Sequence, residues 1–261
     1  KGGVGKTNIT VNLAVGLSRL GKKVLIIDLD IGMANIDIIT GVSTRASIVE
    51  MINDRRSIFD IIVEGPAGIS MISGGTGLTQ LFQMDAVKLS YFVRQLEQLN
   101  EHYDHILFDL GAGITKDSLE FILASNEMII VLTPEPTSIT DGYALVKTVN
   151  QHEEQIPIYV LVNSCDNEDE GYETALRFKR AAREFLHRDL SIIGTLPFDR
   201  TVSKSVRSQV PFLINAPKSK ISVSMEKLIY TYAGQERTEK KGWDGFITKL
   251  STLFSSKLKK R

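Results

Sequence analysis

Short apolar runs alternate with amphipathic stretches along the chain. Most of the apolar runs are rich in β-branched residues or leucine and lack polar alternation, which is typical of strands buried on both faces. Strands are predicted at residues 24–28, 70–73, 105–110, 128–133, 158–163 and 191–196, and helices near 6–20, 84–100, 116–125, 138–152 and 172–187. Alternation of this kind predicts an α/β fold with a mostly parallel central sheet and helices on both faces.

The pattern changes near the C-terminus. After a helix-like stretch at 219–232 the chain becomes polar, and a second amphipathic segment follows. We therefore expect a domain at 1–232, a linker at 233–242 and an amphipathic helix at 243–261. The large apolar side chains of that helix form one stripe, made of Trp243, Phe246, Ile247, Leu250, Leu253, Phe254 and Leu258.

The charge of this tail suggests what the stripe contacts. From Arg237 to the end there are eight basic residues and two acidic ones, a net charge of +6. Apolar side chains flanked by Lys and Arg suit a helix that lies in an anionic membrane interface. The alternative is a helix that docks on its own domain, and the pattern alone leaves both open.

Composition removes several classes of function. Lys plus Arg and Asp plus Glu number 31 each, so no global field points to nucleic acid. The single Cys165 excludes a disulfide framework and a Cys-rich metal site, which fits a reducing cytoplasm. The four histidines, at 102, 105, 152 and 187, show no metal-ligand spacing. No run approaches the roughly 20 apolar residues of a membrane-spanning helix.

The first seven residues, KGGVGKT, carry the strongest chemical pattern. A phosphate-binding loop reads G-x-x-x-x-G-K-[ST], because backbone N–H groups of a Gly-rich turn cradle phosphates. Gly5, Lys6 and Thr7 supply the last three places, so Lys6 is expected to reach the β- and γ-phosphates and Thr7 to ligate Mg²⁺. The first Gly would fall one residue before Lys1, and we expect a β-strand to precede the loop.

A lysine at each end of the loop resembles the deviant Walker A motif of the MinD/ParA ATPases. The resemblance implies that Lys1 reaches the phosphates bound to the opposite subunit, so that two subunits sandwich two ATP molecules. ATP binding would then act as a dimerisation switch. The residues expected to contact nucleotide here are Gly2, Gly3, Val4, Gly5, Lys6, Thr7 and Asn8.

Two further segments resemble the same family. The run VLIIDLDIGMANID at 24–37 is an apolar strand that ends in two aspartates and resembles switch I. The run HILFDLGAG at 105–113 has the Walker B form. The resemblance implies that Asp30 orients the attacking water, and that Asp28 and Asp109 assist Mg²⁺ through water. The expected metal set is Thr7, Asp28 and Asp109, and the expected catalytic set is Lys1, Lys6 and Asp30.

The turn after the Walker B strand narrows the resemblance. MinD and ParA proteins commonly have proline there, whereas Gly111-Ala112-Gly113 resembles the FlhG group of flagellar-number regulators. In VNSCD, Asn163 matches the strand-end position that contacts adenine in MinD-like proteins, and Pro197 lies where the family closes over the base. The lysine of the guanine-binding N-K-x-D motif is absent, so ATP is preferred to GTP.

The resemblance implies a weak, partner-stimulated ATPase that uses ATP/ADP and Mg²⁺. An FlhG-like protein would form an ATP-dependent homodimer and control flagellar number or placement with the FlhF GTPase and flagellar switch-complex proteins. MinD proteins end in an amphipathic membrane-targeting helix, which favours an anionic membrane as the partner of the tail. The protein would then be cytoplasmic, and peripheral at the inner face of the cell membrane when ATP is bound. The apolar stripe could stay hidden against the domain until dimerisation releases it.

Three other functions remain open. A MinD-type division-site regulator would share every site residue. A ParA-type DNA partition ATPase would need a basic surface on the folded body, whereas the basic excess lies in the tail, so no nucleic acid is expected as a partner. A non-enzymatic scaffold is disfavoured because Lys6, Thr7, Asp30 and Asp109 are all present.

Overall fold

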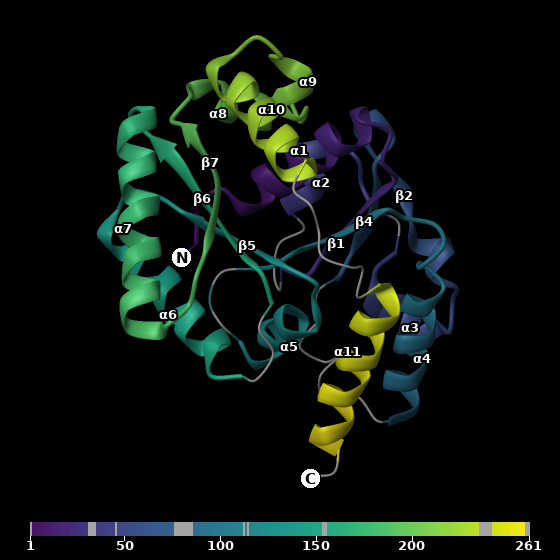
Figure 1. The fold of residues 1–261 in the computed structure, drawn as a ribbon. Helices are drawn as coiled ribbons and strands as arrows, with labels where there is room; N and C mark the ends of the chain where they lie inside the picture. Colours follow the sequence, from purple (N-terminus) through teal and green to yellow (C-terminus); the bar gives the residue numbers. More distant parts are fainter. Residues whose placement is uncertain are drawn as a thin grey trace.

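The computed structural model describes residues 2–30, 35–44, 46–75, 86–111, 113, 115–152, 156–234 and 242–258 (Figure 1). The strands are β1 (Val24–Asp28), β2 (Val63–Glu64), β3 (Ser70–Ser73), β4 (His105–Asp109), β5 (Met128–Leu132), β6 (Ile158–Cys165) and β7 (Ser191–Pro197). The α-helices are α1 (Lys6–Arg19), α2 (Asn35–Thr40), α3 (Ile48–Asp54), α4 (Ala86–Glu97), α5 (Lys116–Ala124), α6 (Pro136–Asn150), α7 (Glu168–Leu186), α8 (Arg200–Arg207), α9 (Phe212–Asn215), α10 (Lys220–Ala233) and α11 (Trp243–Leu258). Two short 3₁₀ helices, η1 (Ile58–Ile61) and η2 (Pro66–Gly68), flank β2.

The strands form two sheets, one in the order β2-β3-β1-β4 and one in the order β5-β6-β7. All strand pairs are parallel except the pair between the short β2 and β3. The carboxyl ends of parallel strands therefore share an edge, where ligands bind in α/β folds. The register places Asp28 of β1 directly beside Asp109 of β4 at that edge.

Helices cover both faces of the sheets, as the alternation of strand and helix predicted. In β1, Val24 and Ile26 belong to a buried cluster that includes residues of α1 and α10. Leu25 and Ile27 point the other way, into a cluster with residues of α3, α4, α5 and α11. The second sheet packs against α6 and α7 through a third cluster. Strands buried on both faces explain why their sequences lack polar alternation.

The predicted strands are confirmed, with ends that shift by no more than two residues. Helix bounds were less accurate. The helix predicted at 172–187 begins four residues earlier, because the side chain of Asn167 caps it by accepting a hydrogen bond from the Glu170 N–H at 2.9 Å. The sequence pattern missed the short elements α2, α3, α8, α9, β2, η1 and η2. Such elements span too few residues to show a period.

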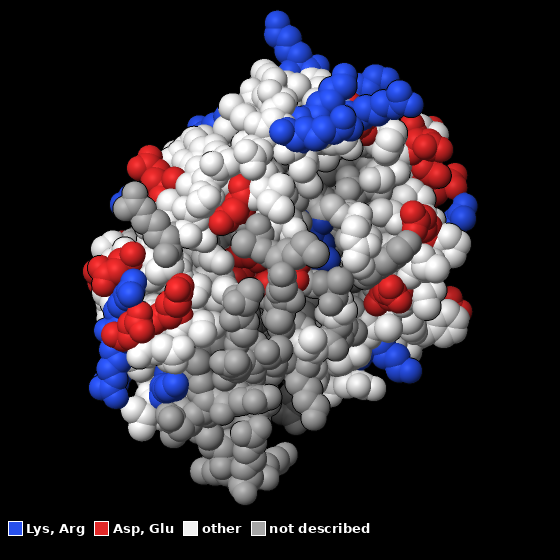
Figure 2. Space-filling view, turned by 180° about the vertical axis from the view of Figure 1, so that it is seen from behind, with Lys and Arg blue, Asp and Glu red and all other residues white. Residues whose placement is uncertain are grey.

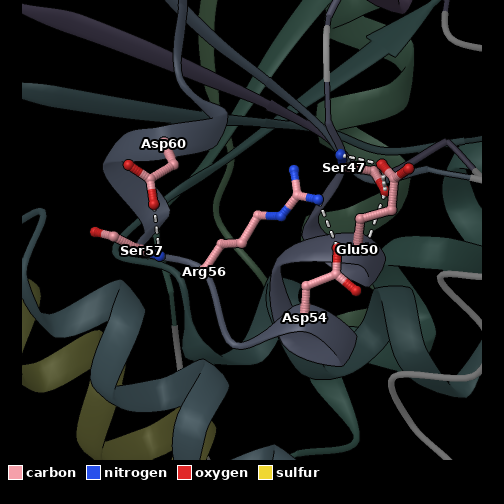
Figure 3. A network of polar contacts seen from close by, with 6 residues as sticks. All are labelled: Ser47, Glu50, Asp54, Arg56, Ser57 and Asp60. Carbon is pink, nitrogen blue, oxygen red and sulfur yellow. Dashed lines mark hydrogen bonds and ion pairs between the residues drawn. The ribbon is translucent and has the colours of Figure 1, made fainter.

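Local polar contacts fix the missed elements near residue 50 (Figure 3). Ser47 caps α3 by accepting a hydrogen bond from the Glu50 N–H, and the Glu50 carboxylate accepts one from the Ser47 N–H at 2.7 Å. This reciprocal capping box satisfies two backbone donors at the start of the helix. Ser57 and Asp60 repeat the arrangement at η1. These signals were present in the sequence as S-x-x-E and S-x-x-D.

The tail helix α11 lies against α4 and α5 (Figure 1). Four residues of its apolar stripe are buried, namely Phe246, Ile247, Leu250 and Phe254, with an exposed fraction of 1% for Phe246 and 0% for Leu250, whereas Trp243 and Leu253 are half-buried. The ring of Phe246 stacks on Phe108 of β4, with a centroid distance of 5.2 Å, and Trp243 donates a hydrogen bond from Nε1 to the Leu96 carbonyl at 2.8 Å. The described α11 is therefore a docked helix. The side chain of Leu258 lies outside the described part of the structure.

A cavity of about 1980 Å³ separates the two sheets. Its walls include the facing strands β4 and β5, the helix α1, and Trp243 and Phe246 of α11. Within the described residues, no helix is long and apolar enough to span a membrane.

Candidate functional site

The glycine-rich loop leads directly into α1. Gly5 is the N-cap of α1 and has a left-handed backbone with a φ of 92°. A Cβ at this position would also lie 2.5 Å from Nδ2 of Asn163. Both the backbone and the close approach therefore require glycine. Because α1 begins at Lys6, its free N–H groups and positive dipole end face the same place as the loop, which favours an anion there.

Two aspartates stand side by side in front of this loop. Asp28 ends β1 and Asp109 ends β4, and their backbones are paired in the sheet. Asp28 accepts a hydrogen bond from the Asp30 N–H at 2.9 Å. Asp109 accepts one from the Thr10 hydroxyl at 3.2 Å. One oxygen of each carboxylate is thus held by the protein.

The other oxygen of each carboxylate has no hydrogen-bond partner among the described residues. Oδ2 of Asp28 and Oδ2 of Asp109 are buried and accept no hydrogen bond within the described part of the chain. Burial raises the pKa of Asp28 to about 7, and the nearby charges of Asp109 and Asp30 add to this effect. Burial also raises the pKa of Asp109, although Thr7, Thr10 and the charge of Lys6 oppose it. Buried carboxylates in this state are costly unless a cation compensates them.

These residues fit a magnesium ion bound together with phosphates. The described residues contain no group of three or more His, Cys, Asp or Glu that could hold a metal ion by themselves. Mg²⁺ rarely needs such a group, because one or two carboxylates with phosphate oxygens and waters complete its shell. The two orphaned oxygens of Asp28 and Asp109, beside the hydroxyl of Thr7, are suitable donors for that ion or for its bound waters.

Asp30 is the third carboxylate at this edge. Its Oδ2 accepts a hydrogen bond from Nδ2 of Asn35, the first residue of α2, at 3.1 Å. Its Oδ1 lies against Gly111, where an added Cβ would be only 2.5 Å from it. Asp30 is close enough to Asp28 and Asp109 for its charge to raise the pKa of both.

The residues expected to contact the base also converge on the loop. Asn163 of β6 donates a hydrogen bond from Nδ2 to the Val4 carbonyl at 2.9 Å. Pro197 ends β7 and is paired with Cys165 of β6. The residue after it, Phe198, is 64% exposed. Asn163 is thus joined to the loop, whereas Pro197 lies on the neighbouring strand.

The structure brings together most of the residues that the sequence singled out. The loop from Gly2 to Asn8 with Asp28, Asp30, Asp109 and Asn163 lies at one edge. Lys1 lies outside the described residues. The sequence pattern missed Thr10 and Asn35, which donate hydrogen bonds to Asp109 and Asp30, and it gave no sign that Gly111 lies against Asp30. Thr10 follows Thr7 by one helical turn, a spacing that could have indicated it. The contact of Asn35 had no sequence signal.

Comparison with known proteins identifies the family of the chain. A family model described as an AAA domain matches residues 1–160. Antiactivator FleN of Pseudomonas aeruginosa is 31% identical over 87% of this chain and 81% of its own length. Flagellum site-determining protein YlxH of Helicobacter pylori is 34% identical over 87% of this chain and 77% of its own length.

Solved structures show the same fold. The septum site-determining protein MinD of Pyrococcus horikoshii, complexed with Mg-ADP, superposes with a TM-score of 0.73 and covers 90% of this chain and 93% of its own. Its identity of 24% supports the fold alone. The loop, the paired aspartates, the sequence relatives and the shared fold lead to one assignment: this chain belongs to the MinD/ParA family of P-loop ATPases.

Proposed function

We propose that this protein is an FlhG-like ATPase switch that controls flagellar number or placement. Two observations from the relatives support the flagellar role: one is named an antiactivator and the other a flagellum site-determining protein. The structural observation that carries the switch is the stack of Phe246 on Phe108. Phe108 directly precedes Asp109, so the docked tail helix contacts the strand that ends in the nucleotide site.

In the proposed ATPase cycle each polar residue at the carboxyl edge has one task. The loop N–H groups and Lys6 bind the phosphates, and Thr7, Asp28 and Asp109 hold the ion and its waters. Bound Mg²⁺ neutralises the charge that develops on the phosphoryl group. Asp30 orients the attacking water. Asn163 and Pro197 lie beside the base, which we take to be adenine.

Dimerisation is the second part of the proposal. Lys1 is proposed to contact nucleotide held by a partner subunit, so that ATP joins two copies and hydrolysis separates them. A Lys1→Ala variant is expected to lose ATP-dependent dimerisation and to retain the ATP affinity of the monomer. Size-exclusion chromatography with a non-hydrolysable ATP analogue measures the first, and fluorescent-nucleotide titration the second. An equal loss of monomer affinity would contradict the role in trans.

Release of α11 is the third part. Four residues of the apolar stripe are buried in the described state, so the helix must leave α4 and α5 before it can enter a membrane interface. We propose that the ATP-bound dimer favours the undocked helix and that anionic lipid then binds it. Two tails on one dimer raise the avidity without new contacts. Hydrolysis would return the monomer to the cytoplasm, and FlhF and switch-complex proteins are the proposed partners.

A tether tests this cycle directly. The side chains of Asn100 and Asp244 meet in a hydrogen bond of 3.2 Å that joins the segment after α4 to α11. Cysteines at both positions, bridged by a short bis-maleimide, should hold α11 in its docked place. Cys165 is 1% exposed and should not react. Flotation with anionic vesicles should show ATP-dependent binding of the untethered protein and at least tenfold less binding of the tethered protein.

Two controls define the result. The double-cysteine protein without the bridging reagent should bind vesicles like the wild type. The tethered protein should still bind ATP, because the cross-link lies away from the loop. If tethered and untethered proteins bind vesicles equally, or if the wild type ignores vesicles in both nucleotide states, α11 is a structural helix and the membrane part of the proposal is wrong.

One observation favours a second candidate, a ParA-type interaction with DNA. Figure 2 shows Lys and Arg gathered at the end of the molecule where α8, α9 and α10 lie. Arg200, Lys204 and Arg207 are exposed and share one face of α8 at i, i+4 and i+7. Such a stripe on the folded body was not evident from the net charge. DNA binding that weakens steeply with salt, and that disappears on reversing these three charges, would favour this candidate.

A MinD-type division-site regulator is the other alternative to the flagellar role. Its nucleotide site would be built from the same residues, so geometry does not separate it from the flagellar role. Pull-down of this protein with FlhF and, separately, with division inhibitors, in ADP and in a non-hydrolysable ATP analogue, distinguishes the two. Nucleotide-dependent retention of a division inhibitor, with no retention of FlhF, would replace the flagellar assignment.

A further inference from the structure

Both oxygens of the Asp30 carboxylate lie against residues of other segments. Oδ2 accepts a hydrogen bond from Nδ2 of Asn35 at 3.1 Å. Oδ1 lies over the Cα of Gly111, at a place where a Cβ would be 2.5 Å away. Asn35 begins α2 and Gly111 lies two residues after β4, so two separate segments meet at one side chain.

This holding matters because the surroundings repel a third carboxylate. Asp28 accepts a hydrogen bond from the Asp30 N–H at 2.9 Å, and Asp109 is paired with Asp28 in the sheet, so three carboxylates of like charge share this edge. Without Asn35 the carboxylate would turn away from like charges and toward solvent. A donor on one oxygen and a closely fitting surface under the other keep it at the edge where the loop and the paired aspartates converge.

The glycine at 111 is explained by space and not by backbone strain. Gly111 is not among the described glycines with positive φ, so its backbone suits any L-residue. The three atoms nearest to an added Cβ all belong to Asp30: Oδ1 at 2.5 Å, Cγ at 3.1 Å and Cα at 3.5 Å. A side chain at this position would therefore displace Asp30 and leave the turn itself unstrained.

We propose that Gly111 and Asn35 are positioning residues that fix the Asp30 carboxylate for ATP hydrolysis. The inference rests on the proposed role of Asp30 in orienting water, and it assigns a task to Gly111, the second residue after the Walker B strand. A residue with a Cβ at 111 requires a different placement of the switch I aspartate. Gly111 and Asp30 therefore form one unit in this chain.

The decisive variant is Gly111→Ala. Misplacement of a catalytic group by about 1 Å can cost about 100-fold in rate, so we expect kcat to fall between tenfold and 100-fold. The KM for ATP and the affinity for a non-hydrolysable analogue should stay within twofold, because neither Gly111 nor Asp30 is proposed to bind the nucleotide. In an Asp30→Ala background the same change should alter kcat by less than twofold, since no carboxylate remains to be displaced.

A matched control lies in the same turn. Gly113 has a φ of 88°, and a Cβ there would meet nothing within 4 Å. Gly113→Asn keeps a residue that tolerates this backbone, and kcat should stay within twofold of the wild type. Asn35→Leu removes the amide donor at similar size. It should lower kcat in the same way as Gly111→Ala and should likewise have no effect in the Asp30→Ala background.

The outcomes separate this inference from the proposed function. If Asp30→Ala abolishes hydrolysis but Gly111→Ala and Asn35→Leu keep wild-type kcat, the inference is overturned and the ATPase assignment stands. If Asp30→Ala hydrolyses ATP normally, the role of Asp30 and the inference both fail. A crystal structure of Gly111→Ala gives a readout besides activity: the carboxylate of Asp30 should have moved from its place beside residue 111, and an unmoved carboxylate would overturn the inference.

Discussion

Two consecutive residues of β4, Phe108 and Asp109, belong to two different regions of the molecule. Asp109 belongs to the edge where the loop and the aspartates converge, and Phe108 belongs to the face on which α11 docks. The two regions differ in whether their buried groups have partners. Asp109 and its neighbour Asp28 each keep a buried oxygen without a described partner. Phe108 stacks on Phe246 and lies 5.3 Å, between ring centroids, from Phe121. The carboxylate oxygens at the edge can gain a partner when a cation binds, whereas the aromatic rings of the docking face already have theirs.

This difference shows where regulation can act. A buried carboxylate without a partner raises the free energy of the ligand-free state and lowers it again when a cation binds. A completed apolar interface gains nothing from a ligand, and it opens only if another surface offers the same burial. In the proposed cycle, the edge senses nucleotide and the α11 interface responds to it.

The first way to sharpen the comparison is to remove Asp30, the group proposed to orient the attacking water. Asp30→Ala should lower the rate of ATP hydrolysis by at least about 100-fold, because positioning and electrostatics supply most of the catalysis of phosphoryl transfer. ATP binding should persist, and the ATP-bound dimer should accumulate. Phosphate release measures the rate of hydrolysis, and light scattering measures the dimer. A monomeric variant that hydrolyses ATP at the wild-type rate would contradict the assignment.

The second is to compare two phenylalanines of equal burial. Phe178 of α7 and Phe246 of α11 are each 1% exposed. Phe178→Ala should cost about 3–5 kcal/mol of unfolding free energy, which is typical of a cavity in a core. Phe246→Ala should cost less, because undocking of α11 limits the loss to the docking free energy. Urea denaturation measures both values.

Hydrogen exchange provides the control for this pair. In Phe246→Ala the amides of α11 should exchange faster while those of β1 keep their protection, as expected for a local opening. In Phe178→Ala protection should fall in the strands of the second sheet. If Phe246→Ala lowers the protection of β1 as much as that of α11, the tail helix is an integral part of the core and is not a separable switch.

The docking of α11 was harder to predict from the sequence than the loop and its aspartates. The loop and the two aspartates follow motifs, because phosphate binding restricts residue types at fixed spacings. The stripe of α11 was equally clear as a pattern, but an apolar stripe describes only the need for burial. Whether Phe246 meets Phe108 or a lipid depends on a surface formed by α4, α5 and β4, which no local pattern encodes.

Two other features explain where prediction stopped. Asn35 was not expected at the site because its contact depends on how α2 turns back toward Asp30, and α2 has only six residues. The cavity lined by β4, β5, α1 and α11 also forms between segments that lie far apart in the sequence, so no local pattern indicated it.

The third prediction removes the charge of one of the two buried aspartates at the edge. Asp28→Asn removes a buried charge whose Oδ2 has no described partner. At pH 8 the ligand-free protein should become more stable by about 1–3 kcal/mol, the usual cost of such a group. The gain from added Mg²⁺ and ADP should shrink at the same time. Thermal unfolding with and without Mg-ADP measures both. Asp54→Asn, at an exposed carboxylate paired with Arg56, is the control and should change little.

The pH dependence of this effect follows from the pKa of Asp28. Burial raises the pKa to about 7 from an ordinary value of 3.8, so the folded state binds the proton more tightly than the unfolded state. The contribution of Asp28 to the stability of the ligand-free protein should therefore fall as pH rises from about 4 to about 7. The Asp28→Asn variant should show a weaker fall over this range. An identical pH profile would show that Asp28 is not the group responsible.

The smallest expected effect concerns Trp243, the first residue of α11. Trp243 stacks on Phe246 at a centroid distance of 4.7 Å and donates to the Leu96 carbonyl. Trp243→Phe keeps an aromatic ring but removes the N–H donor and part of the apolar indole, so docking should weaken by at least about 1 kcal/mol, or roughly fivefold in the docking equilibrium. In ADP, vesicle binding should rise slightly, because less free energy is needed to release α11. Asn100→Ala, which loses only the exposed hydrogen bond to Asp244, should change vesicle binding even less. If Trp243→Phe instead binds vesicles more weakly than the wild type in ADP, the indole contributes more free energy to the lipid contact than to docking on the domain.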